Sequence, residues 1–428
     1  MSAVKLPPCD VMRHMILKGF KEPIVFTRCI EDWDVLSWSL DTWAEKFGDR
    51  VLPFRSGVRK STKVPQWEAL CKKIYLTMEE FVKLEMSDAK KEETTSGDSS
   101  SRWMYFDYKY LNEWFPDQHS LLQTVTWKKF GFPERGGSVS TIWIGNDGAH
   151  TPCHLDTYGC NLVAQVYGRK QWILFPSEKT SSLLPTRIPY EESSIYSNLN
   201  FYSPDPNIAN VLQEAYVVTL KPGDVLFVPR HWWHYVENVG VALSDDESRL
   251  EESLVRFFVS QICKDLPEHR LHQLLNPNEV ELVNDSLAVT GQQVEICLEK
   301  CQQNEGCSTK LDVDIGSESG HCGNEKRPRL DGKSDLCIHE NTSASNKLTQ
   351  EDVLHRFKDV ISVVPKYSVS EFRSLLTEKQ KSFCSQNVEG VSWEGAADEH
   401  LKRLQGIINA FCHPEVISKV KDRILTQV

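Results

Sequence analysis

The sequence lacks a long hydrophobic run and an excess of positive charge, and each absence argues against a class of protein. No run of about 18 apolar residues occurs along the 428 residues, so we expect no transmembrane helix and no membrane partner. Lysine and arginine total 49 against 60 acidic residues, and this net charge of −11 argues against a protein that coats nucleic acid. The remaining composition, 40% hydrophobic and 25% charged, is that of a globular protein.

Two further absences bear on the cellular compartment. Residues 1–20 lack the uninterrupted apolar core of a signal peptide. The 13 cysteines also lack the tight paired spacing of a structural zinc site, even in their densest group, Cys297, Cys301, Cys307 and Cys322. Free thiols in a reducing compartment, and hence a cytoplasmic location, are the expectation. A nuclear location stays open because residues 326–329 form a short basic cluster.

Short β-rich runs with glycine and proline punctuation dominate the middle of the chain. The runs are 139–144, 162–167, 171–175, 216–220 and 225–228. Their spacing favours a β-sandwich or barrel over a parallel α/β sheet. Apolar residues with a helical period predict helices at 38–47, 78–84 and 247–264, and the tail 348–428 is predicted to be helical.

These patterns predict five regions along the chain. They are an N-terminal α/β part (1–137), a β core with a following helix (138–264), a helical extension (265–301), a disordered linker (302–347) and a C-terminal helical region (348–428). The linker is predicted because it is rich in Gly, Ser, Asp, Asn and Lys and poor in large apolar groups.

One segment carries recognisable chemistry, the run from Thr151 to Asp156. In an extended strand, residues i and i+2 project to the same face, so His154 and Asp156 can reach one point. A second segment supplies another imidazole, His234, just after a strand that ends in Pro229. Two histidines and one carboxylate on one face of a metal form the facial triad of non-haem Fe(II) oxygenases. His231, three residues before His234, is the weaker alternative ligand.

The order of these motifs resembles the JmjC-domain family, in its hydroxylase-like branch with members associated with small heat-shock proteins. The resemblance lies in residues 21–26, 151–175, 185–194 and 222–236. It implies a mainly β protein, with a double-stranded β-helix (a cupin-like jelly roll), N-terminal helices and a helical tail. It also implies Fe(II) and 2-oxoglutarate as cofactors.

The resemblance assigns a role to each candidate residue. His154, Asp156 and His234 match the catalytic iron ligands, and Lys170 matches the lysine that pairs with the distal carboxylate of 2-oxoglutarate. A buried dianion needs such a cationic partner. Thr151 matches a hydroxyl donor to the same carboxylate, Asn161 an amide near the cosubstrate, and Tyr105 a phenol on that carboxylate. Four tryptophans are expected to pack the barrel, namely Trp143, Trp172, Trp232 and Trp233.

One departure from the family leaves enzymatic activity open. The strand after His234 is expected to be shorter than in other members, because 237–244 passes directly into an acidic helix. A truncated inner strand would leave hydrogen-bonding groups unpaired. The alternatives are an active protein hydroxylase, a demethylase with the same iron chemistry, a catalytically weak scaffold, and a cupin with Zn²⁺ or Mn²⁺.

The partners implied by the resemblance are proteins. They are a protein substrate or a small heat-shock protein, with a homodimer formed through the helical tail as a further expectation. A role in the stress response would follow from the second partner.

Overall fold

A computed structural model describes most of the two ends of the chain and all but a few residues of its β core. The described residues are 5–68, 71–91, 102–157, 159–191, 194–238, 250–264, 266–276, 294, 348–384 and 399–426. The predicted linker, most of the predicted helical extension, residues 239–244 after His234, the dense cysteine group and the basic cluster lie outside them. Among the described helices, none combines the length and hydropathy that crossing a membrane requires.

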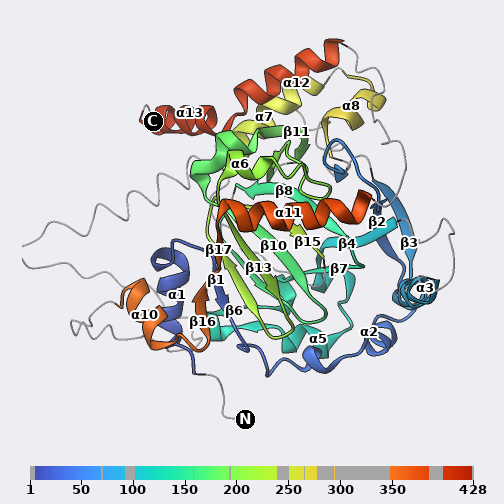
Figure 1. The fold of residues 1–428 in the computed structure, drawn as a ribbon, viewed down its shortest axis with the longest axis vertical. Coiled ribbons are helices and arrows are strands. Elements are labelled where there is room, and N and C mark those ends of the chain that lie inside the picture. Colours follow the sequence, from blue (N-terminus) through green and yellow to red (C-terminus); the bar gives the residue numbers. More distant parts are fainter. Residues whose placement is uncertain are drawn as a thin grey trace, which may run out of the picture.

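Two antiparallel sheets form the core (Figure 1). In spatial order, the larger sheet contains β11 (Pro185–Glu191), β12 (Ser194–Ser197), β8 (His150–Asp156), β15 (Trp233–Glu237), β10 (Lys170–Phe175), β13 (Ala215–Leu220) and β17 (Lys366–Tyr367). The smaller sheet contains β16 (Ile361–Val363), β1 (Ile24–Phe26), β14 (Val225–Val228) and β9 (Asn161–Ala164). Strands distant in sequence alternate in both sheets, and the expected jelly-roll core is confirmed.

Apolar side chains from both sheets meet in one buried cluster. Val163 and Leu226 come from the smaller sheet, while Trp172, Leu174 and Val236 come from the larger one. These positions alternate with other residues along each strand, as the period of two in a half-buried strand requires. Four of the five predicted β-rich runs, 162–167, 171–175, 216–220 and 225–228, therefore fall on strands of these two sheets.

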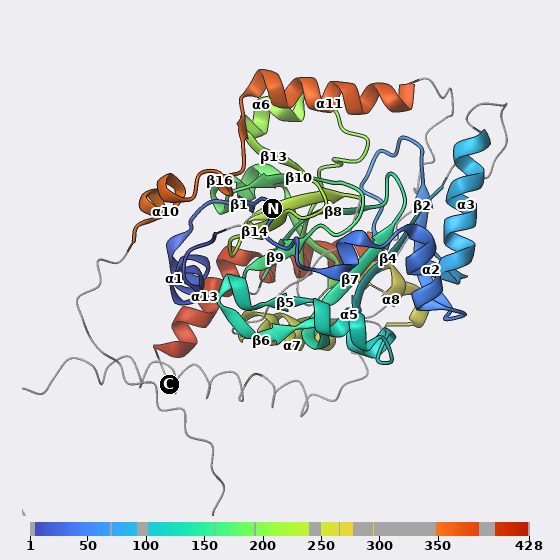
Figure 2. The same cartoon turned by 90° about the horizontal axis from the view of Figure 1, so that it is seen from below.

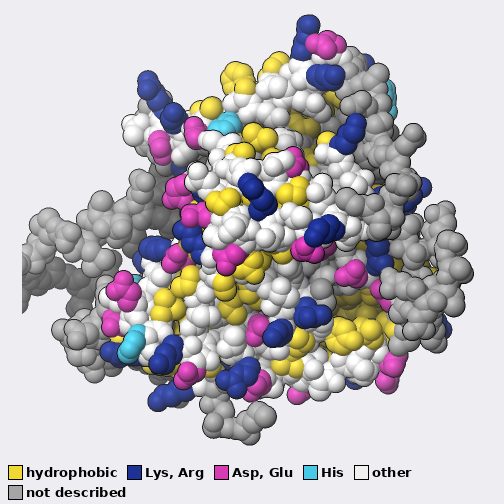
Figure 3. Space-filling model, viewed as in Figure 1, with side chains coloured by type: hydrophobic (Ala, Val, Ile, Leu, Met, Phe, Trp, Pro, Cys, Tyr) yellow, Lys and Arg dark blue, Asp and Glu magenta, His cyan; other side chains and the backbone are white. Residues whose placement is uncertain are grey.

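The N-terminal part adds a third sheet beside the core. Its order is β3 (Lys72–Leu76), β2 (Leu52–Val58), β4 (Arg102–Tyr110) and β7 (Thr141–Gly145), and a separate hairpin pairs β5 (Thr126–Trp127) with β6 (Phe132–Gly136). Figure 2 shows the layers in order: α11 and α6 outside the larger sheet, then the smaller sheet, then the β5–β6 hairpin on the opposite side. On the face shown in Figure 3, both signs of charge are interspersed.

Helices surround these sheets, and most are short. The α-helices are α1 (Cys9–His14), α2 (Leu40–Phe47), α3 (Met78–Lys91), α4 (Leu111–Trp114), α5 (His119–Thr124), α6 (Ile208–Leu212), α7 (Leu250–Cys263), α8 (Glu268–Leu274), α10 (Gln350–Arg356), α11 (Val369–Cys384), α12 (Glu399–Phe411) and α13 (Pro414–Leu425). The other turns of helix are η1 (Met15–Gly19), η2 (Asp34–Ser37), η4 (Lys128–Phe130), η5 (Gly137–Val139) and η6 (Ser177–Leu183).

The predicted helix boundaries rest on identifiable caps. Ser39 accepts a hydrogen bond from the Thr42 amide and begins α2, and Gly48, with a positive φ of 59°, ends it. At α11 the Ser368 hydroxyl and the Glu371 carboxylate each accept a hydrogen bond from the other residue's amide, and together they form a capping box.

The tail contains strands as well as helices, so the prediction of a wholly helical 348–428 is wrong at residues 361–367. There β16 pairs with β1 and β17 pairs with β13, and each strand adds to one of the two core sheets. Both strands are too short to show a period of two in the sequence, so only the partner strands reveal them. The chain thus returns to the core after the undescribed residues 295–347.

Helix α11 then crosses the larger sheet (Figure 1). Its side chains Phe372 and Leu376 are fully buried, and the ring of Phe372 lies 5.9 Å from that of Phe175. Farther along the helix, the Lys379 ammonium forms an ion pair with the Glu237 carboxylate at the end of β15. The tail is therefore part of the jelly roll's packing.

Candidate metal centre

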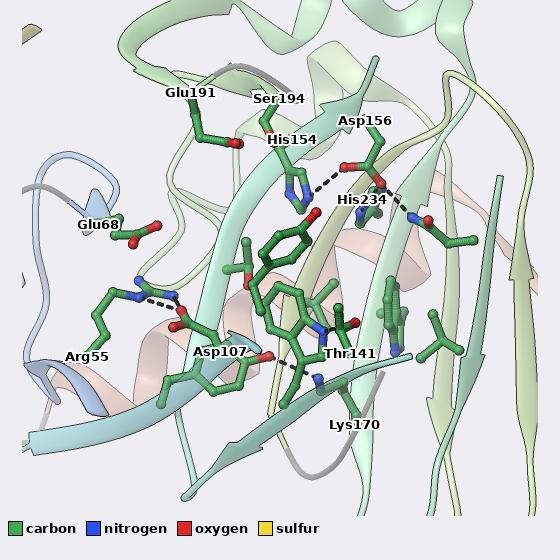
Figure 4. Close-up of a pocket in the computed structure, with 18 of the residues that line it drawn as sticks. Arg55, Glu68, Asp107, Thr141, His154, Asp156, Lys170, Glu191, Ser194 and His234 are labelled. Carbon is green, nitrogen blue, oxygen red and sulfur yellow. Dashed lines mark hydrogen bonds and ion pairs between the residues drawn. The ribbon is translucent and has the colours of Figure 1, made fainter. Parts of the chain in front are cut away.

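Three side chains converge on one point between the core sheets. His154 and Asp156 lie two residues apart on β8 and share a face, and β15 places His234 directly beside His154. The Asp156 carboxylate oxygens lie 3.4 Å from His154 Nε2 and 3.5 Å from His234 Nε2. One ligand atom from each of the three lies within 4.8 Å of the others (Figure 4). The predicted triad is assembled, and His231 is not part of this cluster.

Backbone carbonyls orient both imidazoles. His154 Nδ1 lies 3.0 Å from the Pro152 carbonyl oxygen, and His234 Nδ1 lies 3.0 Å from that of Trp232. A carbonyl oxygen only accepts hydrogen bonds, so each Nδ1 carries a proton and Nε2 is the nitrogen that each ring offers to a metal. Metal-binding histidines are commonly fixed in this way by a second hydrogen bond.

Asn161, at the start of β9, holds the carboxylate of the triad. Its Nδ2 donates a hydrogen bond of 2.5 Å to Asp156 Oδ2. The sequence predicted Asn161 beside the cosubstrate; in the structure it contacts the acidic ligand. Its Oδ1 is buried without a hydrogen-bond partner in the described residues and faces the same cavity. This orphaned acceptor is one sign that the cavity holds a further polar group.

The electrostatics of the triad suit a cation. Burial by itself raises the pKa of Asp156, but His234, His154 and Asn161 outweigh it and hold this pKa at about 2. Burial, with a further contribution from His154, lowers the pKa of His234 to about 4. The pKa of His154 is raised: burial lowers it, and the hydrogen bond and charge of Asp156 outweigh that. At neutral pH the site therefore presents a carboxylate and at least one neutral imidazole, the ligand forms that metals require.

A buried ammonium lies at the other end of the cavity. The Lys170 side chain, on a residue only 1% exposed, donates a hydrogen bond of 3.0 Å from Nζ to the Tyr105 hydroxyl. Its Nζ also lies 5.4 Å from the centre of the Tyr105 ring and 5.7 Å from that of Trp143. The Tyr105 hydroxyl is hydrogen-bonded to Thr151 as well. The structure thus brings Lys170, Tyr105 and Thr151 together.

This ammonium has no carboxylate within ion-pair distance among the described residues. Burial therefore lowers the pKa of Lys170 to about 7, against a weak opposing effect of Asp107. A buried cation without a counter-ion is unfavourable unless a ligand supplies one. Lys170 is a site for an anionic group.

Both ends belong to one cavity of about 130 Å³. Its walls include Trp143 and Trp172, which the sequence predicted only as packing. Figure 4 shows the triad at one end, Lys170 at the other, and Glu68 and Glu191 at one side. A small molecule in this cavity would lie between the triad and Lys170.

Five charged lining residues were not identified from the sequence, namely Arg55, Glu68, Asp107, Lys109 and Glu191. Arg55 forms a buried ion pair of 2.7 Å with Asp107, and Glu68 and Glu191 line the wall nearby. Burial, together with the charge of Asp107, raises the pKa of Glu68 to about 7. These residues come from β2, β4, β11 and a loop, and no spacing in the sequence signals that they meet.

The donor set fits a ferrous ion with open coordination positions. Two imidazole nitrogens and one carboxylate suit iron better than calcium or magnesium, which prefer oxygen ligands alone. The Lys170 ammonium and the orphaned Asn161 oxygen fit a small acid held beside such a metal. Strand β15 pairs with β8 on one side and with β10 on the other, while residues 239–244, which bear on the predicted shortening of this strand, lie outside the described residues.

Comparisons with known proteins agree with this geometry. Residues 13–258 match the model of the cupin-like domain family. HSPB1-associated protein 1 of Homo sapiens is 42% identical over 283 residues, which cover 62% of this chain, and its homolog from Danio rerio is 39% identical over 316 residues, or 70% of each chain. Lysine-specific demethylase JMJ31 of Arabidopsis thaliana is 30% identical over 138 residues, or 31% of this chain and 23% of the demethylase.

The match to the mammalian relatives is partial. The aligned residues span 57% of the human protein and 58% of the Bos taurus protein. The family match nevertheless covers more than half of this chain and includes the whole triad and Lys170. The chain belongs to the cupin-like JmjC family.

Proposed function

We propose that this protein is an Fe(II)- and 2-oxoglutarate-dependent oxygenase that hydroxylates a protein side chain. One observation carries the proposal: a His-Asp-His cluster shares one cavity with an ammonium for which the described residues supply no counter-ion. A keto acid that chelates iron with one end and carries a carboxylate at the other matches this separation of charge. Zn²⁺ or Mn²⁺ in non-redox chemistry would give the buried Lys170 no such partner.

The chain's own residues would divide the work. His154, Asp156 and His234 would hold the metal, which supplies oxygen activation when bound. Lys170, with Tyr105 beside it, would anchor the distal carboxylate of 2-oxoglutarate. The ring of Trp172, whose centre lies 5.6 Å from that of His234, and the ring of Trp143 would exclude water from the space between. Asn161 would keep the Asp156 carboxylate in position.

The proposed partner is a small heat-shock protein. The proposed location of this protein is the cytoplasm, with entry into the nucleus in addition. The support is the name of the relatives, HSPB1-associated protein 1. A protein substrate follows from the same relationship, and the demethylase names of more distant relatives make methyl-lysine the competing substrate. Incubation of the protein with HSPB1, followed by mass spectrometry, would detect a 2-oxoglutarate-dependent gain of one oxygen or a loss of methyl groups.

The second candidate function is a scaffold that binds small heat-shock proteins without turnover. The name of the relatives, HSPB1-associated protein 1, supports it, because that name states an association and no catalytic activity. Under this proposal the protein would bind HSPB1 equally well with and without metal.

Anaerobic titration tests the oxygenase proposal. Addition of 2-oxoglutarate to the Fe(II)-loaded protein should produce a visible charge-transfer band, and addition of oxygen should then release succinate. The variant His154→Ala should give neither signal. A wild-type protein that binds Fe(II) but shows no band and no succinate with any peptide would leave only the scaffold.

A further inference from the structure

A second hollow lies outside the active-site cavity, between the N-terminal helices and the β6 strand. Its volume is about 390 Å³. Charged and apolar side chains both line it. The large apolar ones are Ile16, Leu17 and Phe20 from the helical side, Phe132 from β6, and Phe227 and Trp232 from the core, and all of them except Leu17 are buried. Leu17 is 44% exposed, so part of this apolar surface is open to solvent. We call this hollow the N-terminal groove.

The two walls of the groove are firmly attached to each other. Gly131 comes so close to α1 that a Cβ added there would lie 2.5 Å from the Cys9 carbonyl oxygen. Arg13 ties the same walls through a hydrogen bond of 3.0 Å to the Gly131 carbonyl and an ion pair of 2.6 Å with Glu134. Its guanidinium also lies 4.9 Å from the centre of the Phe132 ring. The groove is thus a preformed surface.

The rim of the groove is basic in a protein that is acidic overall. Its charged lining residues are Arg13, Lys21, Arg135 and Arg230, with Glu134 as the single acid, whereas the whole chain carries a net charge of −11. Lys21 and Arg230 are exposed. Such a local reversal of charge around an apolar floor is complementary to a segment that carries acidic and large apolar side chains together.

The groove adjoins the metal centre through two short turns. Gly159 and Cys160 line the groove, three and four residues after Asp156. Trp232 also lines it, and the Trp232 carbonyl oxygen is the one that orients His234. A segment that fills the groove therefore lies against both turns that support the metal ligands.

We propose that the N-terminal groove binds an acidic, apolar segment of a partner polypeptide. Its apolar side chains would contact Phe20, Phe132 and Trp232, and its carboxylates would face Lys21 and Arg230. The groove's small, apolar floor favours a polypeptide over a nucleic acid, whose phosphates would meet few of the rim cations at once. The inference goes beyond the oxygenase proposal and does not depend on turnover.

Fluorescence anisotropy with the full chain tests this inference. The probe is a fluorescein-labelled peptide of about ten residues in which aspartate alternates with leucine. The double variant Lys21→Glu/Arg230→Glu should weaken binding at least about tenfold, because it reverses two exposed rim charges. The matched control, Lys73→Glu/Lys402→Glu, makes the same change in net charge at exposed positions on β3 and α12 and should bind as the wild type does.

Four results would overturn the inference. Equal binding by the two double variants would place the peptide elsewhere. Equal binding of a peptide in which serine replaces leucine would reduce the groove to a site for anions, and preferential binding of a single-stranded oligonucleotide would assign it to nucleic acid. Finally, failure of the peptide to bind, together with a dimer that Arg230→Glu dissociates, would identify a second copy of this chain as the occupant.

Discussion

The two ends of the cavity at the candidate metal centre bury charge in opposite ways. At one end an anion, Asp156, is surrounded by two imidazoles and an amide, and its pKa falls to about 2. At the other end a cation, Lys170, has only a phenol and aromatic rings around it, and its pKa falls to about 7. Within the described residues, the first charge is stabilised by the protein and the second is not.

This difference indicates which kind of ligand suits each end of the cavity. The Asp156 end keeps its ionised form without help, so it is prepared for a cation at any physiological pH. The Lys170 end keeps its charge only marginally, so an anion that binds there also stabilises the ammonium. The metal end is preorganised, whereas the anchor end is completed by its ligand.

Removal of a metal ligand is the most direct test of the contrast between the metal end and the anchor end. The variant His154→Ala should lower the affinity for Fe(II), or for Co²⁺ as a probe, by more than about a hundredfold, because one of three protein ligands is lost. Isothermal titration calorimetry measures this affinity. The matched control His231→Ala removes an imidazole that lies outside the cluster and should bind metal normally. Equal losses in the two variants would show that the metal binds elsewhere.

Removal of the Lys170 ammonium should weaken ligand binding only at the anchor end of the cavity. Lys170→Met should weaken 2-oxoglutarate binding to the metal-loaded protein roughly a hundredfold, since a buried carboxylate would lose its ionic partner. Metal affinity should stay unchanged. Lys109→Met is the control, because Lys109 lines the same cavity but donates its hydrogen bond to the Asp107 backbone. A loss of metal binding in Lys170→Met would contradict the separation of the two ends.

A variant at Asn161 tests whether this residue serves the metal end or the anchor end of the cavity. Asn161→Ala removes the 2.5 Å hydrogen bond to Asp156 and should reduce metal affinity roughly tenfold. The affinity of the metal-loaded variant for 2-oxoglutarate should stay within about twofold of the wild type. Asn210→Ala, at an exposed position on α6, serves as the control. A selective loss of 2-oxoglutarate binding would instead restore the role that the sequence predicted for Asn161.

The smallest expected effect concerns pH. With the pKa of Lys170 at about 7 in the free protein, the ammonium that binds the anion is lost as the pH rises. The affinity for 2-oxoglutarate should therefore fall about fivefold between pH 7 and pH 8 and change little below pH 6. Calorimetry in buffers of different ionisation enthalpy should show proton uptake on binding near pH 8. An affinity that is flat across this range would mean that Lys170 keeps its charge unaided.

The metal end could be predicted from the sequence because its geometry is local. His154 and Asp156 follow from the period of two in a strand, and a buried strand just before His234 directs that residue to the same place. Lys170, at the start of β10, required the family resemblance, since a lysine after a glycine turn also fits an ordinary hairpin. The main β-rich runs were equally predictable, because a strand of four or more residues is long enough to show β-rich composition or a period of two in the sequence.

The remaining features depend on contacts between distant segments. Nothing near Asn161 in the sequence indicates that its amide bonds to Asp156 and not to a cosubstrate. The Arg55–Asp107 ion pair joins two strands whose register the sequence does not reveal. Strand β16, with only Ile361, Ser362 and Val363, is a strand because β1 offers it a free edge.

The return of the tail to both core sheets has a consequence for synthesis on the ribosome. His154, Asp156 and His234 are synthesised before residues 361–367. In the nascent chain, the outer edges of β1 and β13 therefore stay unpaired until β16 and β17 have been made. Exposed strand edges promote association with other chains. A transcript that stops before Leu348 would therefore encode a protein that contains His154, Asp156 and His234 but leaves these two strand edges open to association with other chains.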